Sequence, residues 1–345
     1  MPFDHLLRSR QTPLTMALLI VMAIVVSACG TGAPSAAIAV PKTPVSIQLA
    51  WTHEYSSASF YAAEKNGHFA AQNLDVRLEA GGFGPQGYIV PIAQVISGTV
   101  DFGVTGAPDL ILARAEGKPV VAVATILQRS PLAIFSLTKS GIHRPQDLVG
   151  HSVAVADGSA TQLYNTLLKS QHIDPATVKT VPRTSYGIDL LAKGEVDAMV
   201  AWVINEGVQL NEAGLKTNVM LMSDYGVDSY EMVLFTTEKM IAEHPDTVKR
   251  FVKASIQGMQ DVINNPDQAA NMVLTYDSKL NLDGQRRRMQ ATLPLLSPPG
   301  VRLGVMQPDI WKLTHQMLLD QKVLTQPIDL DRVYTMKFLD EVSGN

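Results

Sequence analysis

Two short stretches decide the fold: Ser-Gly-Thr-Val-Asp-Phe-Gly-Val at residues 97–104 and Lys-Gly-Glu-Val-Asp-Ala-Met-Val at residues 193–200. The residues that recur at matching places are Gly98, Val100, Asp101 and Val104 in the first copy and Gly194, Val196, Asp197 and Val200 in the second. In each copy a helix is predicted to end at the glycine, and a strand to begin within two residues of it. The recurrence predicts two similar lobes within one chain.

The same order of elements precedes both copies. A strand at residues 45–51 leads into a helix at residues 58–66, and a strand at residues 152–156 leads into a helix at residues 161–171. Such alternation is typical of parallel strands joined by crossover helices, so both lobes are predicted to be α/β. Ligands of these folds bind beyond the carboxyl ends of the strands, and we therefore expect a cleft where two such edges face each other.

Short apolar or β-prone runs at residues 135–138 and 232–236 are the predicted crossings between the lobes. The first lobe is then expected to comprise residues 45–135 and 236–345, and the second lobe residues 136–235. The C-terminal part is predicted to form helices that pack on the first lobe, at residues 245–264, 266–275, 283–296 and 308–321.

The N-terminus has the pattern of a targeting segment. Arg8 and Arg10 precede an apolar stretch at residues 14–26, which is shorter than the roughly 20 residues that a membrane span needs. The lone cysteine of the chain, Cys29, follows Val-Ser-Ala directly. That ending resembles the lipobox of bacterial lipoproteins, although Val26 stands where the pattern prefers leucine. An ordinary signal peptide is the alternative.

The resemblance implies a signal peptide over residues 1–29 and lipidation of Cys29. Each buried CH₂ of an acyl chain contributes about 0.8 kcal/mol to membrane binding, which is enough for lipidation to hold a soluble domain at a membrane. Residues 30–44 are rich in Gly, Ala, Pro, Ser and Thr and are predicted to be a flexible tether. We therefore expect an extracytoplasmic, membrane-anchored protein, at the cell surface or in the periplasm.

The bulk composition excludes some classes of function. The 345 residues are 46% hydrophobic and 17% charged, with a net charge of −4, which fits two domains with a sizeable core. The one basic cluster, at residues 286–288, is interpreted as a solvated helix face. Without a basic patch, no nucleic-acid partner is expected. We expect a monomer.

The resemblance to a known family rests on several short runs in order. They are Trp-Thr-His-Glu-Tyr (51–55), Phe-Tyr-Ala-Ala (60–63), Gly-His-Phe (67–69), Gly-Thr-Val-Asp-Phe-Gly (98–103), Leu-Gln-Arg-Ser-Pro (127–131), Leu-Val-Gly (148–150), Asn-Glu (205–206) and Asp-Tyr-Gly (224–226). Together they resemble the thiamine-pyrimidine-type substrate-binding proteins of ABC importers, over nearly the whole chain after residue 29. The resemblance implies a two-lobed type II periplasmic-binding-protein fold with two crossings.

Candidate ligand-binding residues follow the predicted strands. Trp51 ends the first strand and either stacks on a planar ring or belongs to the core. Gly82 lies in a glycine-rich turn, where backbone amides approach a ligand or simply form the turn. Ser159 lies at the start of a predicted helix, where free N–H groups can hold a carbonyl or anionic group of a ligand. An ordinary helix cap is the alternative. The further candidates are His53, Tyr61, Gln128, Trp202, Asn205, Glu206 and Tyr225. The resemblance adds weight to Asn205 and Glu206.

The His53–Glu54 pair lacks a second pair at zinc spacing, so neither a metal nor a cofactor is expected. The family also resembles the eukaryotic enzymes that make the thiamine pyrimidine, and these carry a cysteine-rich motif that this chain lacks. No other catalytic motif is found, so we expect no enzyme activity.

The resemblance implies capture of a small planar heterocycle, either a thiamine pyrimidine precursor or riboflavin, for an ABC permease partner. The alternatives are nitrate, taurine or alkanesulfonate binding, for which Arg129 is the candidate cation, and ligand presentation by a sensor lipoprotein.

Lipid anchoring has a direct test. Replacing Cys29 with serine removes the thiol that the acyl group needs, so Cys29→Ser is expected to move the protein from the membrane fraction to the soluble fraction. Fractionation followed by mass spectrometry of the N-terminal peptide measures this. Acyl-free wild type and a variant that stays at the membrane would contradict the prediction.

Overall fold

The computed structural model describes residues 41–85, 87–183 and 187–343. The chain divides into Met1–Pro41 and one compact unit, Lys42–Asn345, and the description below concerns the second. The expected signal peptide, Cys29 and nearly all of the tether lie outside the described residues. Strand β1 begins at Thr43, so residues 43 and 44 belong to the first sheet and not to the tether. Within the described residues, no helix has both the length and the apolar character that a membrane crossing requires.

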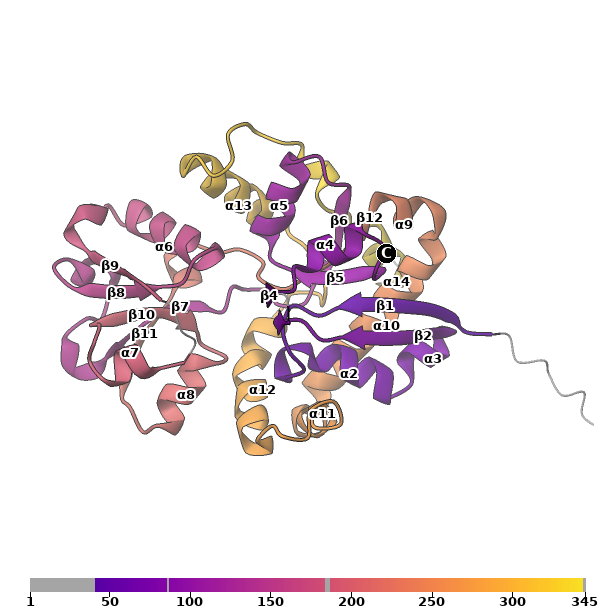
Figure 1. Cartoon of the computed structure of the whole chain (residues 1–345), viewed down its shortest axis with the longest axis horizontal. Coiled ribbons are helices and arrows are strands. Elements are labelled where there is room, and N and C mark those ends of the chain that lie inside the picture. Colours follow the sequence, from indigo (N-terminus) through magenta and orange to yellow (C-terminus); the bar gives the residue numbers. More distant parts are fainter. Residues whose placement is uncertain (1–40, 86, 184–186, 344–345) are drawn as a thin grey trace, which may run out of the picture. The chain divides into compact units, whose positions relative to one another are not determined.

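Two five-stranded sheets form the two lobes of this unit (Figure 1). The first has the strand order β2-β1-β5-β12-β6 and the second the order β11-β7-β10-β8-β9. Three parallel strands stand at one side of each sheet, and the fourth strand runs antiparallel to its neighbours. The strands are β1 (Thr43–Gln48), β2 (Leu74–Glu79), β5 (Phe102–Thr105), β6 (Val120–Thr125), β12 (Val233–Thr237), β7 (Leu132–Leu137), β8 (Ser152–Val155), β9 (Lys179–Pro182), β10 (Ala198–Trp202) and β11 (Thr217–Leu221). The two sheets are therefore the same arrangement built twice, which confirms the two-lobed α/β fold.

The recurring Gly-x-Val-Asp unit makes the same contacts in both lobes. Asp101 Oδ2 accepts hydrogen bonds from the backbone N and the Oγ of Ser46, at 2.7 and 2.9 Å. Asp197 Oδ2 accepts the corresponding pair from Ser152, at 2.8 and 2.7 Å. Each aspartate thus ties the start of one strand to the neighbouring parallel strand. The sequence repeat is a structural repeat.

The crossings between the lobes lie a few residues before the predicted ones. Strand β7 belongs entirely to the second sheet and β12 entirely to the first, so neither passes between lobes. The chain crosses through residues 126–131 and returns through residues 226–232, and the expected boundaries at 135/136 and 235/236 are wrong. The error has a simple cause: apolar runs mark buried strands, whereas the crossings are irregular segments with no periodicity.

Helices cover the sheets, and most of the C-terminal ones pack on the first lobe. Helix α13 also contacts α6 of the second lobe, and α12 contacts α8 there. The helices of the first lobe and the C-terminal part are α2 (Ala58–Lys65), α3 (His68–Ala71), α4 (Pro91–Ile96), α5 (Ala107–Ala115), α9 (Glu238–Glu243), α10 (Pro245–Asn264), α11 (Pro266–Val273), α12 (Leu282–Leu296), α13 (Pro308–Asp320) and α14 (Lys337–Ser343). Those of the second lobe are α6 (Ser159–Ser170), α7 (Asp189–Ala192) and α8 (Glu206–Glu212).

Short elements complete the fold. A two-stranded hairpin, β3 (Phe83–Gly84) and β4 (Gly87–Tyr88), follows the first βαβ unit. Single turns of 3₁₀ helix connect the larger elements, at η1 (Tyr55–Ser57), η2 (Thr138–Ser140), η3 (Pro145–Leu148), η4 (Pro175–Thr177), η5 (Met222–Tyr225) and η6 (Leu330–Arg332).

Helix α10 is the main support of the first lobe. Its buried residues recur at helical spacing, among them Val248, Phe251, Val252 and Met259. Gly258 lies where α10 approaches α2: a Cβ added to it would stand 2.0 Å from the carbonyl oxygen of Ser59. The two backbones are close because this position has no side chain. Helix α2 follows η1, whose neighbours line the cleft described below.

Adding one methyl group at this contact tests its importance. Gly258→Ala forces α2 and α10 apart, and we expect it to lower the free energy of unfolding by about 1–3 kcal/mol, despite the higher helix propensity of alanine. Denaturant unfolding measures the change. Lys253→Ala, on the exposed side of the same helix, is the matched control. An unchanged Gly258→Ala variant would show that the helices adjust freely.

Candidate ligand-binding site

A cleft with a cavity of about 350 Å³ lies between the two lobes, within the size range of small-molecule sites. The carboxyl ends of four parallel strands converge on it: those of β1 and β5 from the first lobe and those of β8 and β10 from the second. The lining residues next to those ends are Ala50, Trp51, Thr105, Gly106, Ala156, Asp157, Val200, Ala201 and Trp202. This is the place where open α/β folds bind ligands.

Trp51 supplies an aromatic wall on the first lobe. Its ring stands edge-on to Phe83, with centroids 5.9 Å apart, and tilted toward Tyr88 at 6.2 Å. The hairpin β3–β4 carries both of these rings, so it holds the indole at the mouth of the cleft. Gly81 allows the hairpin to start here, because a Cβ on it would lie 2.3 Å from the carbonyl oxygen of Leu49.

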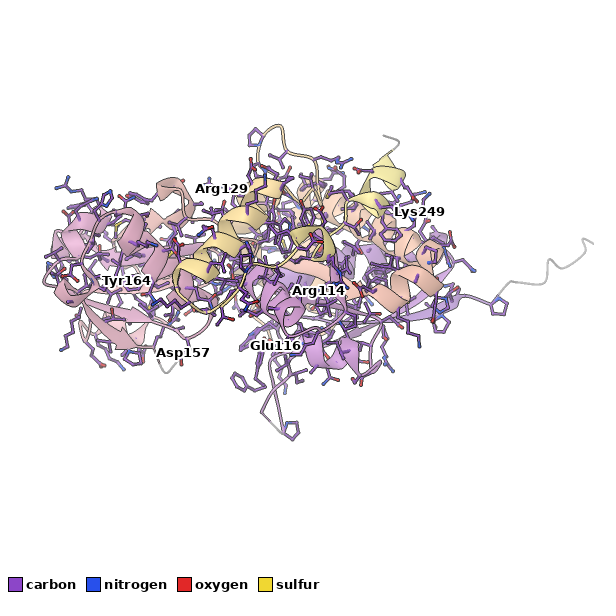
Figure 2. The ribbon with its side chains drawn as sticks, turned by 90° about the horizontal axis from the view of Figure 1, so that it is seen from above. Arg114, Glu116, Arg129, Asp157, Tyr164 and Lys249 are labelled. Atoms are coloured by element: carbon purple, nitrogen blue, oxygen red, sulfur yellow. The ribbon has the colours of Figure 1, made fainter. Side chains whose placement is uncertain are left out.

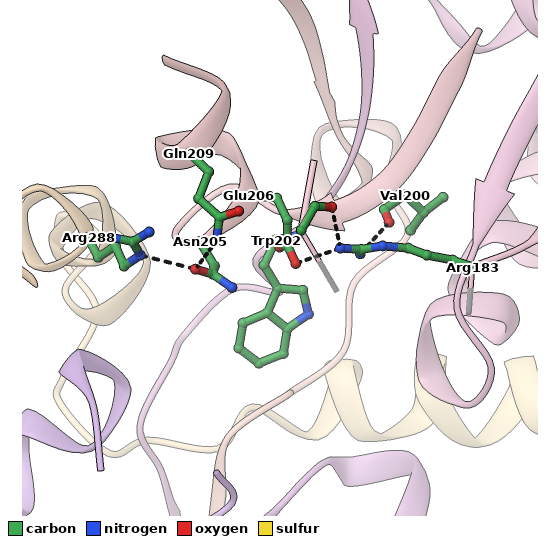
Figure 3. Close-up of polar contacts among 8 residues, drawn as sticks. Arg183, Val200, Trp202, Asn205, Glu206, Gln209 and Arg288 are labelled. Atoms are coloured by element: carbon green, nitrogen blue, oxygen red, sulfur yellow. Dashed lines mark hydrogen bonds and ion pairs between the residues drawn. The ribbon is translucent and has the colours of Figure 1, made fainter. Parts of the chain in front are cut away.

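A buried ion pair organises the wall of the second lobe (Figure 3). Arg183 Nη2 donates to Glu206 Oε1 at 2.7 Å, and both side chains are 5% exposed. Arg183 Nη1 also donates to the carbonyl oxygen of Val200 at 3.2 Å. Glu206 Oε2 accepts a hydrogen bond from the backbone N of Trp202 at 3.2 Å. Both carboxylate oxygens of Glu206 therefore already have partners within the protein.

Trp202 and Asn205 lie beside this pair and also line the cleft. Asn205 Oδ1 accepts hydrogen bonds from Gln209 Nε2 at 3.1 Å and from Arg288 Nε at 3.0 Å (Figure 3). Arg288 belongs to α12, which follows the return to the first lobe, so this bond joins the two lobes. The neighbouring Arg287 makes a second link, from its Nε to Glu212 Oε1 at 2.7 Å.

Acidic side chains occupy the rest of the cleft. Burial raises the pKa of Glu54, on the first lobe, to about 7. Burial raises the pKa of Glu231, on the return crossing, to about 8. Asp109 and Asp157 also line the cleft, and none of these four carboxyl groups has an ion-pair partner among the described residues. Among the residues that the structure describes, no group of three His, Cys, Asp or Glu side chains is arranged to hold a metal ion.

The structure brings half of the candidate residues together. Trp51, Ser159, Trp202, Asn205 and Glu206 line the cleft. They share one signal, since each follows the end of a predicted strand.

The other five candidates do not line the cleft. His53 Nδ1 lies 2.9 Å from the hydroxyl of Tyr61, and Tyr61 is buried against Tyr276 with ring centroids 4.2 Å apart. These two side chains stabilise the packing of the first lobe. Of the remaining three, Gly82 turns the chain with a φ of 86° and Tyr225 packs against the core. Gln128 is buried in the first crossing, and its side-chain amide has no hydrogen-bond partner among the described residues.

The cleft contains acids and a base that the sequence analysis did not select, above all Asp109, Arg183 and Glu231. Asp109 follows strand β5 by four residues, a spacing that the strand-end rule would have included. Arg183 directly follows β9, and Glu231 lies in the return crossing. No local sequence pattern distinguishes either residue from a surface charge. Arg129, which is labelled in Figure 2, was the candidate cation for an anion site. Its side chain donates instead to Ser223 Oγ and Asp224 Oδ1, both at 2.6 Å.

Comparisons with known proteins agree with this architecture. Residues 54–269 match the family model described as NMT1/THI5 like. A riboflavin-binding protein, RibY, of Chloroflexus aurantiacus is 26% identical over 348 residues, covering 94% of this chain and 97% of its own. A formylaminopyrimidine-binding protein of Halalkalibacterium halodurans is 28% identical over 295 residues, covering 82% and 87%.

Solved structures share the fold. The crystal structure of a putative periplasmic sulfonate-binding protein, SsuA, from Methylobacillus flagellatus superposes with a TM-score of 0.69 at 17% identity, covering 88% of this chain and 94% of that one. At this identity the similarity shows the fold alone, and the fold is that of the periplasmic binding proteins.

Breaking the buried ion pair tests its role in the second lobe. Arg183→Met leaves the Glu206 carboxylate buried without its cation, and we expect a loss of about 3–5 kcal/mol in the free energy of unfolding. Adding Glu206→Leu removes the unpaired charge and should recover part of that loss. Denaturant unfolding measures both variants.

Lys193→Met, which breaks an exposed pair with Asp189 in the same lobe, is the matched control and should change stability by less than about 1 kcal/mol. A double variant no more stable than Arg183→Met would show that the two charges are not coupled.

Proposed function

This chain belongs to the NMT1/THI5-like family, and on that premise we propose that it is the extracytoplasmic solute-binding component of an ABC importer and captures a neutral, planar heterocycle. One observation carries the proposal: two indoles, Trp51 and Trp202, line a single cleft from opposite lobes. A flat ring between them gains stacking area from both sides. Such a ligand holds the lobes together, because each lobe supplies one of its two faces.

The charge of the cleft favours a neutral ligand over an anion. Of the described residues that line it, Arg183 is the one cationic side chain, and its guanidinium is paired with Glu206. The carboxyl groups in the lining are those of Glu54, Asp109, Asp157, Glu206 and Glu231. Nitrate, an alkanesulfonate or the sulfonate group of taurine would bring a negative charge among these groups without a free cation to receive it. Riboflavin brings an imide N–H group and the pyrimidine precursors of thiamine bring amino N–H groups, for which carboxylates are acceptors.

Binding without catalysis fits the same site. The two relatives named above are binding proteins, and the alignments with this chain cover 97% and 87% of their lengths. The polar groups of the second-lobe wall are already paired with one another, so they shape the cleft and fix the position of Trp202. In this proposal Glu206 acts through that arrangement, and the direct polar contacts to the ligand come from Asn205, Ser159 and the other acids of the lining.

Delivery to a permease completes the proposal. Closure of the two lobes on the ligand gives the protein a second shape, which a membrane partner distinguishes from the open one. Lipidation at Cys29 would keep the protein at the membrane where that partner lies. We propose that it acts there as a monomer, outside the cytoplasm.

Replacing Trp51 tests the stacking. Trp51→Ala removes one aromatic face of the cleft and is expected to weaken ligand binding about 10- to 100-fold, the range for loss of a buried aromatic anchor. Trp51→Phe keeps a ring and should restore most of the affinity. Calorimetry with riboflavin, with a formylaminopyrimidine and with taurine, nitrate and an alkanesulfonate measures the effect.

The outcome with anions decides between the proposals. Failure of both heterocycles to bind, together with tight binding of an anion that is indifferent to Trp51, would replace the proposed function with anion import.

A further inference from the structure

We propose that the cleft contains a second subsite, formed by Glu231, Asp109 and Ser159, that receives a hydroxyl-bearing chain attached to the ligand ring. This inference rests on the proposed function, since it assigns the part of the ligand that the two indoles do not hold. It distinguishes a ring with a polyol substituent, such as riboflavin, from a small pyrimidine without one.

Glu231 is the central group of the subsite. It stands on the return crossing directly before β12 and is 7% exposed, yet it lines the cleft. Ser159 Oγ, at the start of α6 in the second lobe, donates to Glu231 Oε2 at 2.9 Å. The other oxygen, Oε1, is buried and has no hydrogen-bond partner among the described residues. A buried polar atom without a partner is costly, and because Glu231 belongs to the lining of the cleft, a bound ligand group could supply the missing partner.

Asp109 converges on the same place from α5. Its Oδ2 accepts a hydrogen bond from Thr105 Oγ1 at 2.8 Å, the backbone of Gly106 also interacts with the carboxyl group, and the residue lines the cleft. A Cβ added to Gly106 would lie 3.7 Å from Asp109 Oδ2 and 3.8 Å from Glu231 Oε2. The two carboxyl groups therefore flank one point, and Gly106 leaves the space between them open.

The surroundings of Glu231 keep its carboxyl group protonated near neutral pH. Burial raises its pKa to about 8, and the neighbouring carboxyl groups of Asp109 and Asp228 add to the effect against the hydrogen bond from Ser159. Asp228 accepts backbone hydrogen bonds from Ser130 and Ser229, at 2.8 and 2.9 Å. Because Oε2 already accepts from Ser159, we assign the proton to Oε1, the oxygen that has no partner among the described residues and that a ligand hydroxyl would meet as a donor.

These groups fit hydroxyls better than other ligand groups. The subsite offers a donor at Glu231 Oε1, acceptors at Asp109, and the Ser159 hydroxyl, and a hydroxyl can both donate and accept. An anion would meet two acids. An ammonium group would require Glu231 to lose its proton, so its binding would strengthen as pH rises through about 8.

The experiment compares two flavins on one protein. Lumiflavin has the ring system of riboflavin with a methyl group in place of the ribityl chain. At pH 7 we expect wild type to bind riboflavin about 10- to 100-fold more tightly than lumiflavin, by titration of flavin fluorescence. Glu231→Leu should remove most of that preference by weakening riboflavin, while Glu231→Gln, which keeps an uncharged donor, should restore most of it. Glu195→Leu, at an exposed position of the second lobe, is the matched control.

A pH series adds a second readout. If the protonated form of Glu231 holds the chain, riboflavin affinity should fall about fourfold between pH 6.5 and 8.5 as the proton is lost, and the Glu231→Gln variant should show no such fall. An affinity that rises over this interval, or a fall of equal size in both proteins, would overturn the assignment.

The outcomes separate the two proposals. Equal binding of riboflavin and lumiflavin overturns the subsite and leaves the heterocycle proposal standing. Binding of a formylaminopyrimidine with no binding of either flavin also overturns the subsite, because the ligand then has no chain to fill it. Binding of no heterocycle at all overturns both.

Discussion

The position of β12 is the constraint on which the rest of the structure depends. This strand lies between β5 and β6 in the first sheet, although 107 residues separate Thr125 from its partner Val233 in that pairing, and it is reached only after the chain has built the whole second lobe. The first lobe therefore cannot be completed until the chain returns. Pairing over such a distance is slow to form, but it fixes both crossings and with them the mouth of the cleft. It also carries Glu231 into the cleft, because that residue lies two positions before the start of the strand.

Aromatic rings shape one wall of the cleft, and a buried ion pair shapes the other. The Arg183–Glu206 pair costs desolvation and in return holds Trp202 and the α8 N-terminus in one geometry. On the opposite wall the rings of Phe83 and Tyr88 pack against Trp51. An ion pair stabilises the wall of the second lobe, and the packing of aromatic rings stabilises the wall of the first. The one cationic side chain among the described lining residues, Arg183, is paired with Glu206, which makes the cleft poor in positive potential.

Much of the fold could be predicted from the sequence, because local signals determine it. The helix expected at residues 245–264 has those bounds, since a proline at its start and a regular apolar stripe define it. The repeated Gly-x-Val-Asp unit predicted the second sheet because the aspartate makes the same contact twice. The crossings were misplaced because irregular segments have no period. In the site, strand-end residues such as Trp51 and Trp202 were found, whereas Glu231 was not. Its burial depends on contacts with α6, 72 residues away, that no local pattern encodes.

The two crossings also have a consequence for how such proteins diversify. All five strands of the second sheet come from one uninterrupted stretch between residues 132 and 221, whereas the first sheet needs two separate stretches. A recombination event with its two junctions in the irregular crossings would therefore exchange the whole second lobe and keep the first lobe. A single exchange would replace Arg183, Trp202, Asn205 and Glu206 together and leave Trp51, Asp109 and Glu231 in place. One face of the ligand site can then evolve as a block while the other is inherited unchanged.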